Sequence, residues 1–457
     1  MKIQRGQTAG VATPAPAERQ DKTAAQQGPT ISKGWAAKPT GSTTRPEVTA
    51  PSASALPKAG VRSQVFEAQL DRDTGSRSVS GNKVQLLFDG VNSFAERNKM
   101  IDGAKESICF QTFIFNSDET GWDLAKRLAA KAKEGVQVRV IYDALGTGRA
   151  DPKMFEMMRE AGVDVKAYGE KYKVWDLNDR WHEKHLIVDG KASVQGGMNI
   201  ADEYALGGSG KQVFSRSEKG ADAWRDADMK LEGPAVADTM KAFVRNWTEM
   251  GGSLSEADKA KLFPKLSEVS GGPSVRVVQS NPEVKGLVGT TDKLYLRAIQ
   301  NAQKSITIEN AYFLPPPEIR QAIIDAAKRG VDVKVMSNSK EANDMGFVTD
   351  AARYFYDDML KAGVKIYEKH GGTLHSKTAT FDGEFSIVGS VNLNGRSKNT
   401  DAEVALAVSD SSTAKQLETR FAGGIKETRQ ITMDEMKKES FMTNLKQWAL
   451  STFAWTF

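Results

Sequence analysis

The stretch Ser107-Ile108-Cys109-Phe110-Gln111-Thr112-Phe113-Ile114-Phe115 returns 198 positions later as Ser305-Ile306-Thr307-Ile308-Glu309-Asn310-Ala311-Tyr312-Phe313. Three further blocks return at nearly the same distance: residues 135–140 at 330–335, residues 161–163 at 362–364, and His182 at His375. Because the offsets stay between 193 and 201 over all four blocks, they indicate the duplication of one domain of about 200 residues.

Each copy alternates short apolar segments with segments of helical spacing. In the first copy we expect strands over 84–88, 108–115 and 136–142, and helices over 94–104 and 122–133. This alternation predicts an α/β fold in which helices flank the sheets. Glycine and proline at 251–252 and 271–273 mark the junction of the copies. We therefore expect one domain over 80–250, a second over 273–420, and a C-terminal extension over 421–457.

Composition excludes several classes of protein. The chain has 457 residues, of which 39% are hydrophobic, enough for two or three soluble globular domains. No apolar run approaches the roughly 20 residues that a membrane-spanning helix needs. The single cysteine, Cys109, can form neither an intrachain disulfide nor a cysteine-rich zinc site.

Positive charge is concentrated in the N-terminal segment. Residues 1–60 carry eight basic and three acidic side chains, so they account for the whole net charge of +5 and leave the rest of the chain balanced. A neutral body is a poor candidate for a nucleic-acid groove, and no nucleic-acid partner is expected. Residues 1–60 also hold seven of the fifteen prolines and show no apolar periodicity, which predicts a disordered tail. A lipid tether, a secretion address and an inert extension all remain open for this tail.

Each copy contains one dense polar cluster. The first reads His182-Glu183-Lys184-His185-Leu186-Ile187-Val188-Asp189, followed by Gly196-Gly197-Met198-Asn199. The second reads His375-Ser376-Lys377-Thr378-Ala379-Thr380-Phe381-Asp382, followed by Gly389-Ser390-Val391-Asn392. Residues i and i+2 of a strand share a face, so the histidine and lysine of each copy should project to the same side. A lone histidine on a strand is usually structural, but two copies with matched lysine, aspartate and asparagine spacing point to function.

These groups suit chemistry on a phosphate. Imidazole can act as a nucleophile or a proton carrier near neutral pH, and lysine and asparagine side chains can bind oxyanions. Two such clusters facing each other would surround a phosphate with positive charge and hydrogen-bond donors. One histidine could then attack phosphorus while the other protonates the leaving oxygen. Carboxylates do not cluster around the motifs, so we expect neither a metal site nor a cofactor.

The duplicated His-x-Lys-x4-Asp motif resembles that of the phospholipase D superfamily, and both copies are intact. Within the superfamily the chain is most similar to bacterial cardiolipin synthases that lack transmembrane helices. The similarity runs from about residue 80 to about residue 420, and these strings support it: Gln111–Phe115, Gly196–Ile200, Trp224–Asp226, Leu231–Pro234, Tyr312–Pro315, Gly389–Leu393 and Arg396-Ser397. The resemblance implies two tandem α/β sandwich domains that are related by pseudo-twofold symmetry and share one active site.

The resemblance also implies a role for each matching residue. His182 would form a covalent phosphohistidine intermediate, and His375 would act as general acid and then as general base. The phosphate would be held by these side chains: Lys184, Lys377, Asn199, Asn392 and Ser390. A carboxylate after each motif, Asp226 and Glu403, would bond the other ring nitrogen of a catalytic histidine. Asp189 and Asp382 are expected to anchor the turns of the motifs.

Several positions depart from the family pattern or lie outside it. Gly197 stands where the second copy has Ser390, Gln111 replaces an acidic residue, and Asn394 stands where aspartate is common. The histidines outside the repeat, His185 and His370, are expected to be structural or surface residues. The glycine-rich segment 207–220 is either a surface excursion or a lid, and the aromatic-rich segment 441–457 either packs on the core or inserts at a membrane interface.

The resemblance implies a phosphatidyltransferase that converts two molecules of phosphatidylglycerol into cardiolipin and glycerol. Such an enzyme would work in the cytoplasm at the surface of the inner membrane, with a secreted effector as the alternative, and its oligomeric state stays open. A phospholipase D hydrolase would use the same residues with water as the acceptor. A nuclease or phosphodiesterase is less favoured, because nucleases of this superfamily are usually single-motif homodimers. An inactive scaffold is disfavoured because both motifs are complete.

Overall fold

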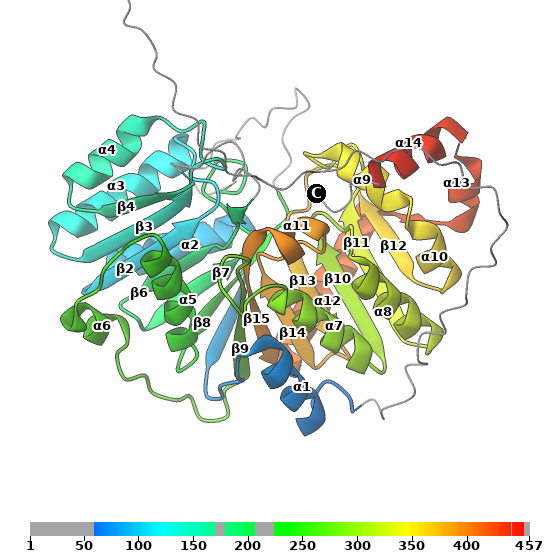
Figure 1. The fold of residues 1–457 in the computed structure, drawn as a ribbon, viewed down its shortest axis with the longest axis horizontal. Helices are drawn as coiled ribbons and strands as arrows, with labels where there is room; N and C mark the ends of the chain where they lie inside the picture. The colour runs from blue at the N-terminus through cyan, green and yellow to red at the C-terminus, as the bar shows by residue number, and fades with distance from the viewer. Residues whose placement is uncertain (1–58, 170–178, 206–223, 440, 452–457) are drawn as a thin grey trace, which may run out of the picture. The chain divides into compact units, whose positions relative to one another are not determined.

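The computed structural model describes residues 59–169, 179–205, 224–439 and 441–451, which form two mixed sheets covered by helices (Figure 1). Almost all of the tail predicted over 1–60 and the whole of the glycine-rich segment 207–220 lie outside the described residues. None of the described helices combines the length and the apolar character needed to cross a bilayer.

The first sheet has the strand order β1-β8-β7-β6-β2-β3-β4. Its strands are β1 (Lys83–Phe88), β2 (Ser107–Thr112), β3 (Gln137–Asp143), β4 (Asp164–Tyr168), β6 (His185–Val188), β7 (Ala192–Gly196) and β8 (Ala227–Glu232). The strands predicted over 84–88, 108–115 and 136–142 are thus confirmed as β1, β2 and β3. Strand β2 ends earlier than predicted because its antiparallel neighbour β6 begins at His185, opposite Gln111.

The second sheet repeats this order strand by strand. Its equivalent strands are β9 (Ser274–Ser280), β15 (Asp401–Ser409), β14 (Phe385–Gly389), β13 (Lys377–Phe381), β10 (Ser305–Asn310), β11 (Asp332–Asn338) and β12 (Lys365–Lys369). In both sheets the first four pairings are antiparallel and the last two are parallel. Strand β16 (Thr428–Ile431) extends the second sheet beyond β12, and the short strand β5 (Arg180–Trp181) also pairs with β15. The predicted α/β fold with a duplicated domain is therefore confirmed.

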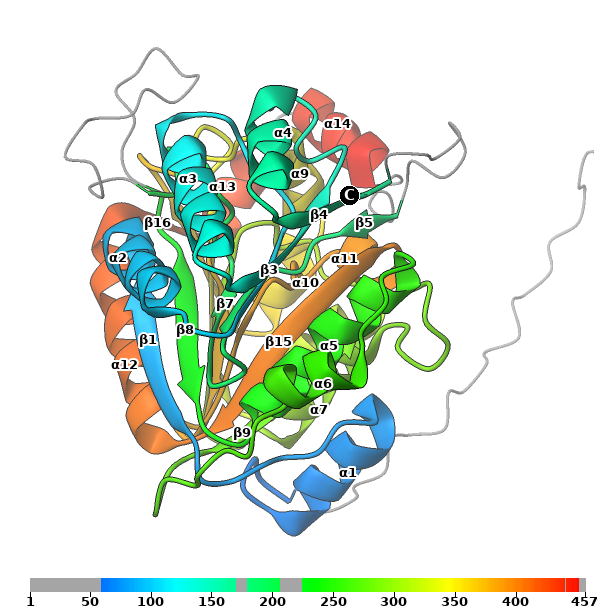
Figure 2. The same cartoon turned by 90° about the vertical axis from the view of Figure 1, so that its left-hand side faces the viewer.

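Buried side chains of the helices and sheets form three large hydrophobic cores and one small cluster. The first half has the helices α2 (Asp89–Gly103), α3 (Glu119–Lys133), α4 (Pro152–Glu160), α5 (Val236–Glu249) and α6 (Glu256–Leu262). The second half has α7 (Thr290–Asn301), α8 (Pro317–Lys328), α9 (Gly346–Arg353), α10 (Tyr356–Lys361), α11 (Gly395–Asn399) and α12 (Ser411–Gly424). One core joins α2, α3 and α4 to one face of the first sheet, and Figure 2 shows these helices toward the viewer. A second core joins α5 to the facing sides of both sheets.

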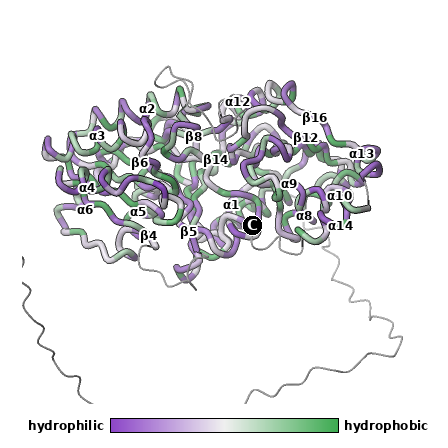
Figure 3. The backbone as a smooth tube through the Cα atoms, turned by 90° about the horizontal axis from the view of Figure 1, so that it is seen from above, coloured by the Kyte–Doolittle hydropathy of each residue, from purple (hydrophilic) through white to green (hydrophobic). Residues whose placement is uncertain are grey.

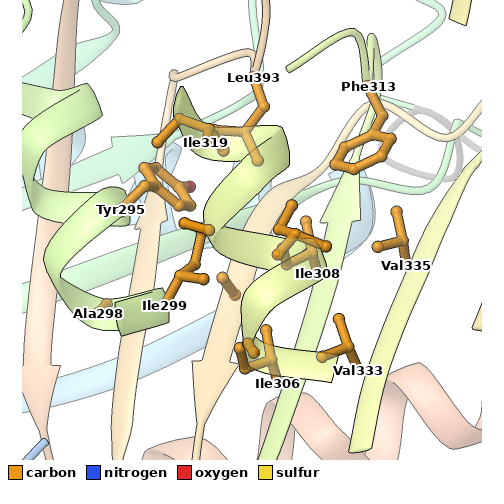
Figure 4. Packing of buried hydrophobic residues seen from close by; sticks show 14 of the residues in the cluster. Tyr295, Ala298, Ile299, Ile306, Ile308, Phe313, Ile319, Val333, Val335 and Leu393 are labelled. Carbon is orange, nitrogen blue, oxygen red and sulfur yellow. The ribbon is translucent and has the colours of Figure 1, made fainter. Parts of the chain in front are cut away.

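The third core lies beneath the outer helices of the second sheet. Figure 4 shows its side chains from α7, α8, β10 and β11: Tyr295, Ile299, Ile319, Ile306, Ile308, Val333 and Val335. Polar and apolar residues alternate along the backbone of both halves, as Figure 3 shows. Since the two halves bury equivalent strands, the packing repeats along with the sequence.

The chain begins and ends its described part with helices on the second half. Helix α1 (Gln64–Thr74) packs on α7, while α13 (Met433–Lys438) contacts α10 and α14 (Phe441–Ser451) packs on α9. In Figures 1 and 2, α1 lies at the bottom and α14 at the top. These two helices therefore mark opposite ends of the second half.

Candidate active site

Each histidine lies beside the chain of the opposite half. Short strand β5 (Arg180–Trp181) pairs with β15 of the second sheet, and the N–H of His182 donates to the carbonyl of Ala402 at 2.9 Å. Equivalently, the N–H of His375 donates to the carbonyl of Arg225 at 2.8 Å, just ahead of β8. The prediction that each histidine and lysine share one strand is wrong in detail. The histidines stand before β6 and β13, because this pairing draws their backbone toward the other half.

A carboxylate from the opposite half bonds each imidazole. The Nδ1 atom of His182 lies 3.1 Å from both oxygens of Glu403 on β15. The Nδ1 atom of His375 lies 2.7 Å from Oδ2 of Asp226, which precedes β8. Since a carboxylate accepts, it places a hydrogen on Nδ1 of each ring and leaves the lone pair on Nε2. The two halves therefore orient each other's histidines.

The two lysines of the motifs are fully buried and curl back on their own segments. The Lys184 ammonium donates to the carbonyl of His182 at 2.6 Å and lies 5.5 Å from the ring centre of Phe113. The Lys377 ammonium lies 2.9 Å from each ring nitrogen of His375. Two positive charges thus stand beside the two imidazoles.

The carboxylates of the motif aspartates accept hydrogen bonds from backbone N–H groups. Asp189 and Asp382 close the turns after β6 and β13 with positive φ angles of 53° and 58°. The carboxylate of Asp189 accepts hydrogen bonds from the three N–H groups of residues 105–107, and that of Asp382 accepts from those of residues 303–305. These contacts tie each motif turn to the start of β2 or β10.

The side chains predicted to hold phosphate are placed differently from one another. Asn199 accepts from the N–H of Ile114 at 3.2 Å and donates to the Tyr204 hydroxyl at 2.9 Å. Asn392 is buried and its amide oxygen has no hydrogen-bond partner among the described residues. Ser390 donates its hydroxyl to Glu403 and accepts from the N–H of Val404 at 3.0 Å, so it faces the carboxylate.

The Gly197 departure has a steric cause. A Cβ atom at Gly197 would overlap the carboxylate of Asp226, so a serine equivalent to Ser390 does not fit there. Asp226 instead accepts from the N–H of Ala227 at 2.7 Å. The longer Glu403 receives hydroxyl hydrogens from Ser390 and Ser397. Residue 197 is therefore small because the carboxylate of Asp226 fills the space.

Gln111 has no charge at the position where the second half has Glu309, and Glu183 supplies a carboxylate close by instead. In the second half, Glu309 on β10 accepts from Arg225 at 2.6 Å and from the hydroxyl of Ser376 at 2.7 Å. In the first half, position 183 carries the carboxylate in place of position 111. Glu183 accepts hydrogen bonds from Asn246 and Gln279, and Asn246 also donates to Gln111. Each motif thus has one buried carboxylate nearby. In the second half it is Glu309 on β10, and in the first half it is Glu183 within the motif itself.

The two histidines outside the repeat differ. His185 is buried with Nε2 2.6 Å from Glu183, whereas His370 is exposed. Both placements match the expectation of structural or surface residues.

Aromatic side chains around the histidines were not predicted as site residues. Phe113 meets His182 with ring centres 5.1 Å apart. His375 meets three rings: Tyr204 at 5.1 Å, Trp224 at 5.4 Å and Tyr312 at 6.4 Å. Three of these four rings lie in strings that support the resemblance, namely Gln111–Phe115, Trp224–Asp226 and Tyr312–Pro315, and Arg225 lies there as well. The contacts of Asn246 and Gln279 left no pattern in the sequence.

Burial and mutual charge set the protonation of the site. Burial, aided by the neighbouring ammonium groups, lowers the pKa of His182 and of His375 well below the ordinary value. Burial also lowers the pKa of Lys184 to about 7 and that of Lys377 to about 8. It raises the pKa of Glu403 to about 7 and that of Asp226 to about 6, against the pull of both lysines.

The arrangement provides two neutral imidazoles with lone pairs on Nε2, two cations and two carboxylates that can stabilise an imidazolium. Such a set can perform nucleophilic substitution at a phosphate diester. Within the described ranges, no cluster of three or more His, Cys, Asp or Glu side chains is arranged to hold a metal ion.

The chain is similar to known proteins over most of its length. The family described as "Cardiolipin synthase, PLD-like domain" matches residues 98–207 and 295–424. The chain is 32% identical to the major cardiolipin synthase ClsA of Bacillus subtilis over 369 residues, which cover 80% of this chain and 73% of that protein. It is 31% identical to a cardiolipin synthase of Listeria monocytogenes over 376 residues, 82% of this chain and 75% of that one.

A solved structure shares the fold. The crystal structure of phosphatidylserine synthase from Haemophilus influenzae superposes with a TM-score of 0.65 at 15% identity, covering 85% of this chain and 97% of that one. At this identity the likeness concerns the fold, and it covers both halves.

Proposed function

The chain belongs to the cardiolipin synthase family of phospholipase D-like proteins, and from that premise we propose that it transfers a phosphatidyl group between two phosphatidylglycerol molecules. The chain is a phospholipase D-type phosphatidyltransferase, and its family acts on phospholipids. The proposed products are cardiolipin and glycerol. The observation that carries this proposal is the pair of His–Lys sets, each bonded to a carboxylate of the other half.

The first step forms a covalent lipid–enzyme intermediate. Nε2 of His182 attacks phosphorus, the bond from phosphorus to the glycerol oxygen breaks, and His375 gives its proton to that oxygen. In the second step His375 takes the proton from a hydroxyl of the acceptor lipid, whose oxygen attacks phosphorus and releases His182. Lys184 and Lys377 balance the charge of the phosphate oxygens in both steps.

Differences between the two imidazoles support these roles. The Nε2 atom of His375 is contacted by Lys377, whereas no described residue donates a hydrogen bond to Nε2 of His182. The low pKa of His182 keeps its lone pair available for attack. An anionic phosphate beside His375 would raise its pKa, because an opposite charge favours the imidazolium, and would thereby load it with the proton it must donate.

A reaction between two lipids has to take place where lipids are. We therefore extend the proposal to an enzyme that binds peripherally to a membrane, and the expected place is the cytoplasmic surface of the inner membrane. The alternative of a secreted effector changes the location but not the chemistry.

Product analysis tests the proposal. The pure chain is incubated with phosphatidylglycerol labelled in its glycerol headgroup, and all products are identified with His182→Ala as the control. Cardiolipin and free glycerol in equal amounts are the expected products. Phosphatidic acid and glycerol without cardiolipin, at all substrate concentrations, would identify a hydrolase and overturn the proposal.

A further inference from the structure

The outward face of helix α14 is apolar where a helix facing water would be polar. Met442, Leu445 and Trp448 recur every three residues and are 68%, 43% and 50% exposed. The opposite side of the helix carries Gln447, which is buried, and Leu450, which packs against the core. Helix α14 therefore already has an inner face, and its three large apolar side chains point away from it.

More exposed apolar side chains stand beside the active site in equivalent places of the two halves. Leu145 follows β3 and is 58% exposed, and its neighbour Gly146 packs against Phe113, the ring beside His182. Met345 follows the equivalent strand β11 and is exposed as well. Its neighbour Asp344 accepts from the hydroxyl of Tyr312 at 2.7 Å, the ring beside His375.

Helix α9 lies between Met345 and the apolar face of α14. It begins with Gly346, carries the exposed Phe347, and packs against α14. We call the set of Leu145, Met345, Phe347, Met442, Leu445 and Trp448 the apolar rim. The apolar rim thus flanks the rings that border both buried histidines and continues onto α14, at the top of Figures 1 and 2.

The carboxylate of Asp344 lies beside Met345, whereas the charged group beside helix α14 is positive and suits an anionic surface. The exposed lysines Lys340 and Lys446 share a single carboxylate, that of Asp350, so the group keeps a net positive charge. Helix α14 itself contains no acidic residue.

We propose that the apolar rim inserts into the boundary between headgroups and acyl chains of a phospholipid bilayer, and so holds the opening of the active site against lipid. This inference rests on the proposed function, since a phospholipid substrate must reach histidines that are more than 90% buried. Tryptophan, leucine and methionine on an exposed helix face are suited to that boundary. Binding through such side chains resists salt, because burial of apolar surface is not screened.

The test compares two variants of the apolar rim with a matched control variant at an exposed apolar residue elsewhere. In the full chain, the triple variant M442Q/L445Q/W448Q removes the apolar face of α14, and L145Q alters the opposite half. The control V65Q changes a side chain that is 54% exposed on α1, at the other end of the second half. Co-sedimentation with vesicles of phosphatidylglycerol and phosphatidylcholine in equal parts measures binding at low and high salt. Turnover of a short-chain, monomeric phosphatidylglycerol measures the active site separately.

The triple variant should bind vesicles about tenfold or more weakly at high salt, and L145Q about threefold, while V65Q binds as the wild type does. Turnover of the monomeric substrate should stay within about twofold for all three variants, since none of these residues belongs to the catalytic set. If the triple variant loses its fold, M442Q alone replaces it, because that side chain is the most exposed of the three.

Unchanged vesicle binding by the triple variant would overturn the inference, as would an equal loss in V65Q. A change in oligomeric state of the triple variant with intact vesicle binding would identify a surface for self-association instead. A wild type that binds vesicles through the rim but makes no cardiolipin would overturn the proposed function and leave the docking surface standing.

Discussion

His182 and His375 occupy equivalent places in the two repeated halves, yet different atoms hold them. Glu403 reaches His182 with a long side chain that is fixed by the hydroxyls of Ser390 and Ser397. Asp226 reaches His375 with a shorter side chain that is fixed by a backbone N–H. After duplication, the position of an accepting oxygen has been kept, whereas the residues that supply and support it differ.

The buried carboxylates next to the two motifs also differ in the residues that supply and bind them. A carboxylate lies under each motif, but Glu309 supplies it from β10 and Glu183 from within the motif itself. Because a buried carboxylate needs donors, each has acquired its own: Arg225 and Ser376 donate to Glu309, whereas Asn246 and Gln279 donate to Glu183. The duplicated halves therefore share the position of a negative charge near each motif, but not the sequence position of the residue that carries it.

The largest effect is expected from removal of either imidazole. His182→Ala and His375→Ala should each lower kcat by about 10³-fold or more with an unchanged fold, and the double variant should be little worse than either single variant. Both histidines act on one phosphate, so their losses should not add. Steady-state kinetics of the three variants measure this, and independent, multiplying losses would mean two separate sites.

Removal of the accepting oxygens should come next. Glu403→Gln and Asp226→Asn should each lower kcat by about 100-fold or more, because an amide can no longer stabilise an imidazolium through Nδ1. Pre-steady-state kinetics would separate the two steps. If both variants kept the kcat of the wild type, the carboxylates would not orient the histidines.

A pair of alanine substitutions at equivalent positions sharpens the contrast between the halves. Gly197→Ala should lower kcat about tenfold or more, because the added Cβ displaces the carboxylate of Asp226 from His375. Ser390→Ala removes one hydrogen bond to a buried carboxylate that keeps a second hydroxyl donor, so its effect should be about threefold to tenfold. The reverse order of these losses would contradict the steric account.

The pH profile of kcat/KM should be bell-shaped and narrow. Below about 6 both carboxyl groups are protonated and have lost the negative charge that stabilises an imidazolium, so activity falls on the acid side. Above about 8 both ammonium groups have lost their charge and phosphate binding weakens. In Glu403→Gln the acid limb should move to lower pH, because the carboxyl group with the higher pKa is gone. A flat profile between about pH 5 and pH 9 would argue against these groups as the titrating ones.

The smallest effect is expected from chelation. Lys184 and Lys377 already supply positive charge next to both imidazoles, so excess chelator should leave turnover unchanged. Complete loss in chelator, restored by one divalent ion, would require a different mechanism for both halves.

Local sequence patterns predicted the elements within each half but not the contacts between the halves. Strands β1, β2 and β3 follow from short β-branched runs, and the repeat predicts their counterparts in the second sheet. The pairing of Arg180–Trp181 with β15 and of Arg225 with Leu374 joins segments more than 140 residues apart, and such pairing leaves no local pattern. For this reason the motifs were expected on single strands, although each histidine is drawn to the other half.

Side-chain partners show the same limit. The resemblance to the phospholipase D superfamily named Asp226 and Glu403 as carboxylates that could orient a histidine. Which histidine each one bonds depends on how the sheets face each other. Ser390 was expected to hold phosphate, and only its three-dimensional position reveals that Glu403 takes its hydroxyl.

Trapping of the intermediate tests most directly whether the two unlike halves form one site with a single nucleophile. The chain is mixed with a labelled phosphatidyl ester of a good leaving group, quenched after one turnover, and its labelled histidine is mapped by mass spectrometry. We expect one phosphatidyl group per chain on His182, none in His182→Ala, and undiminished labelling in His375→Ala, because this leaving group needs no acid. Label on His375, or divided between both histidines, would contradict it.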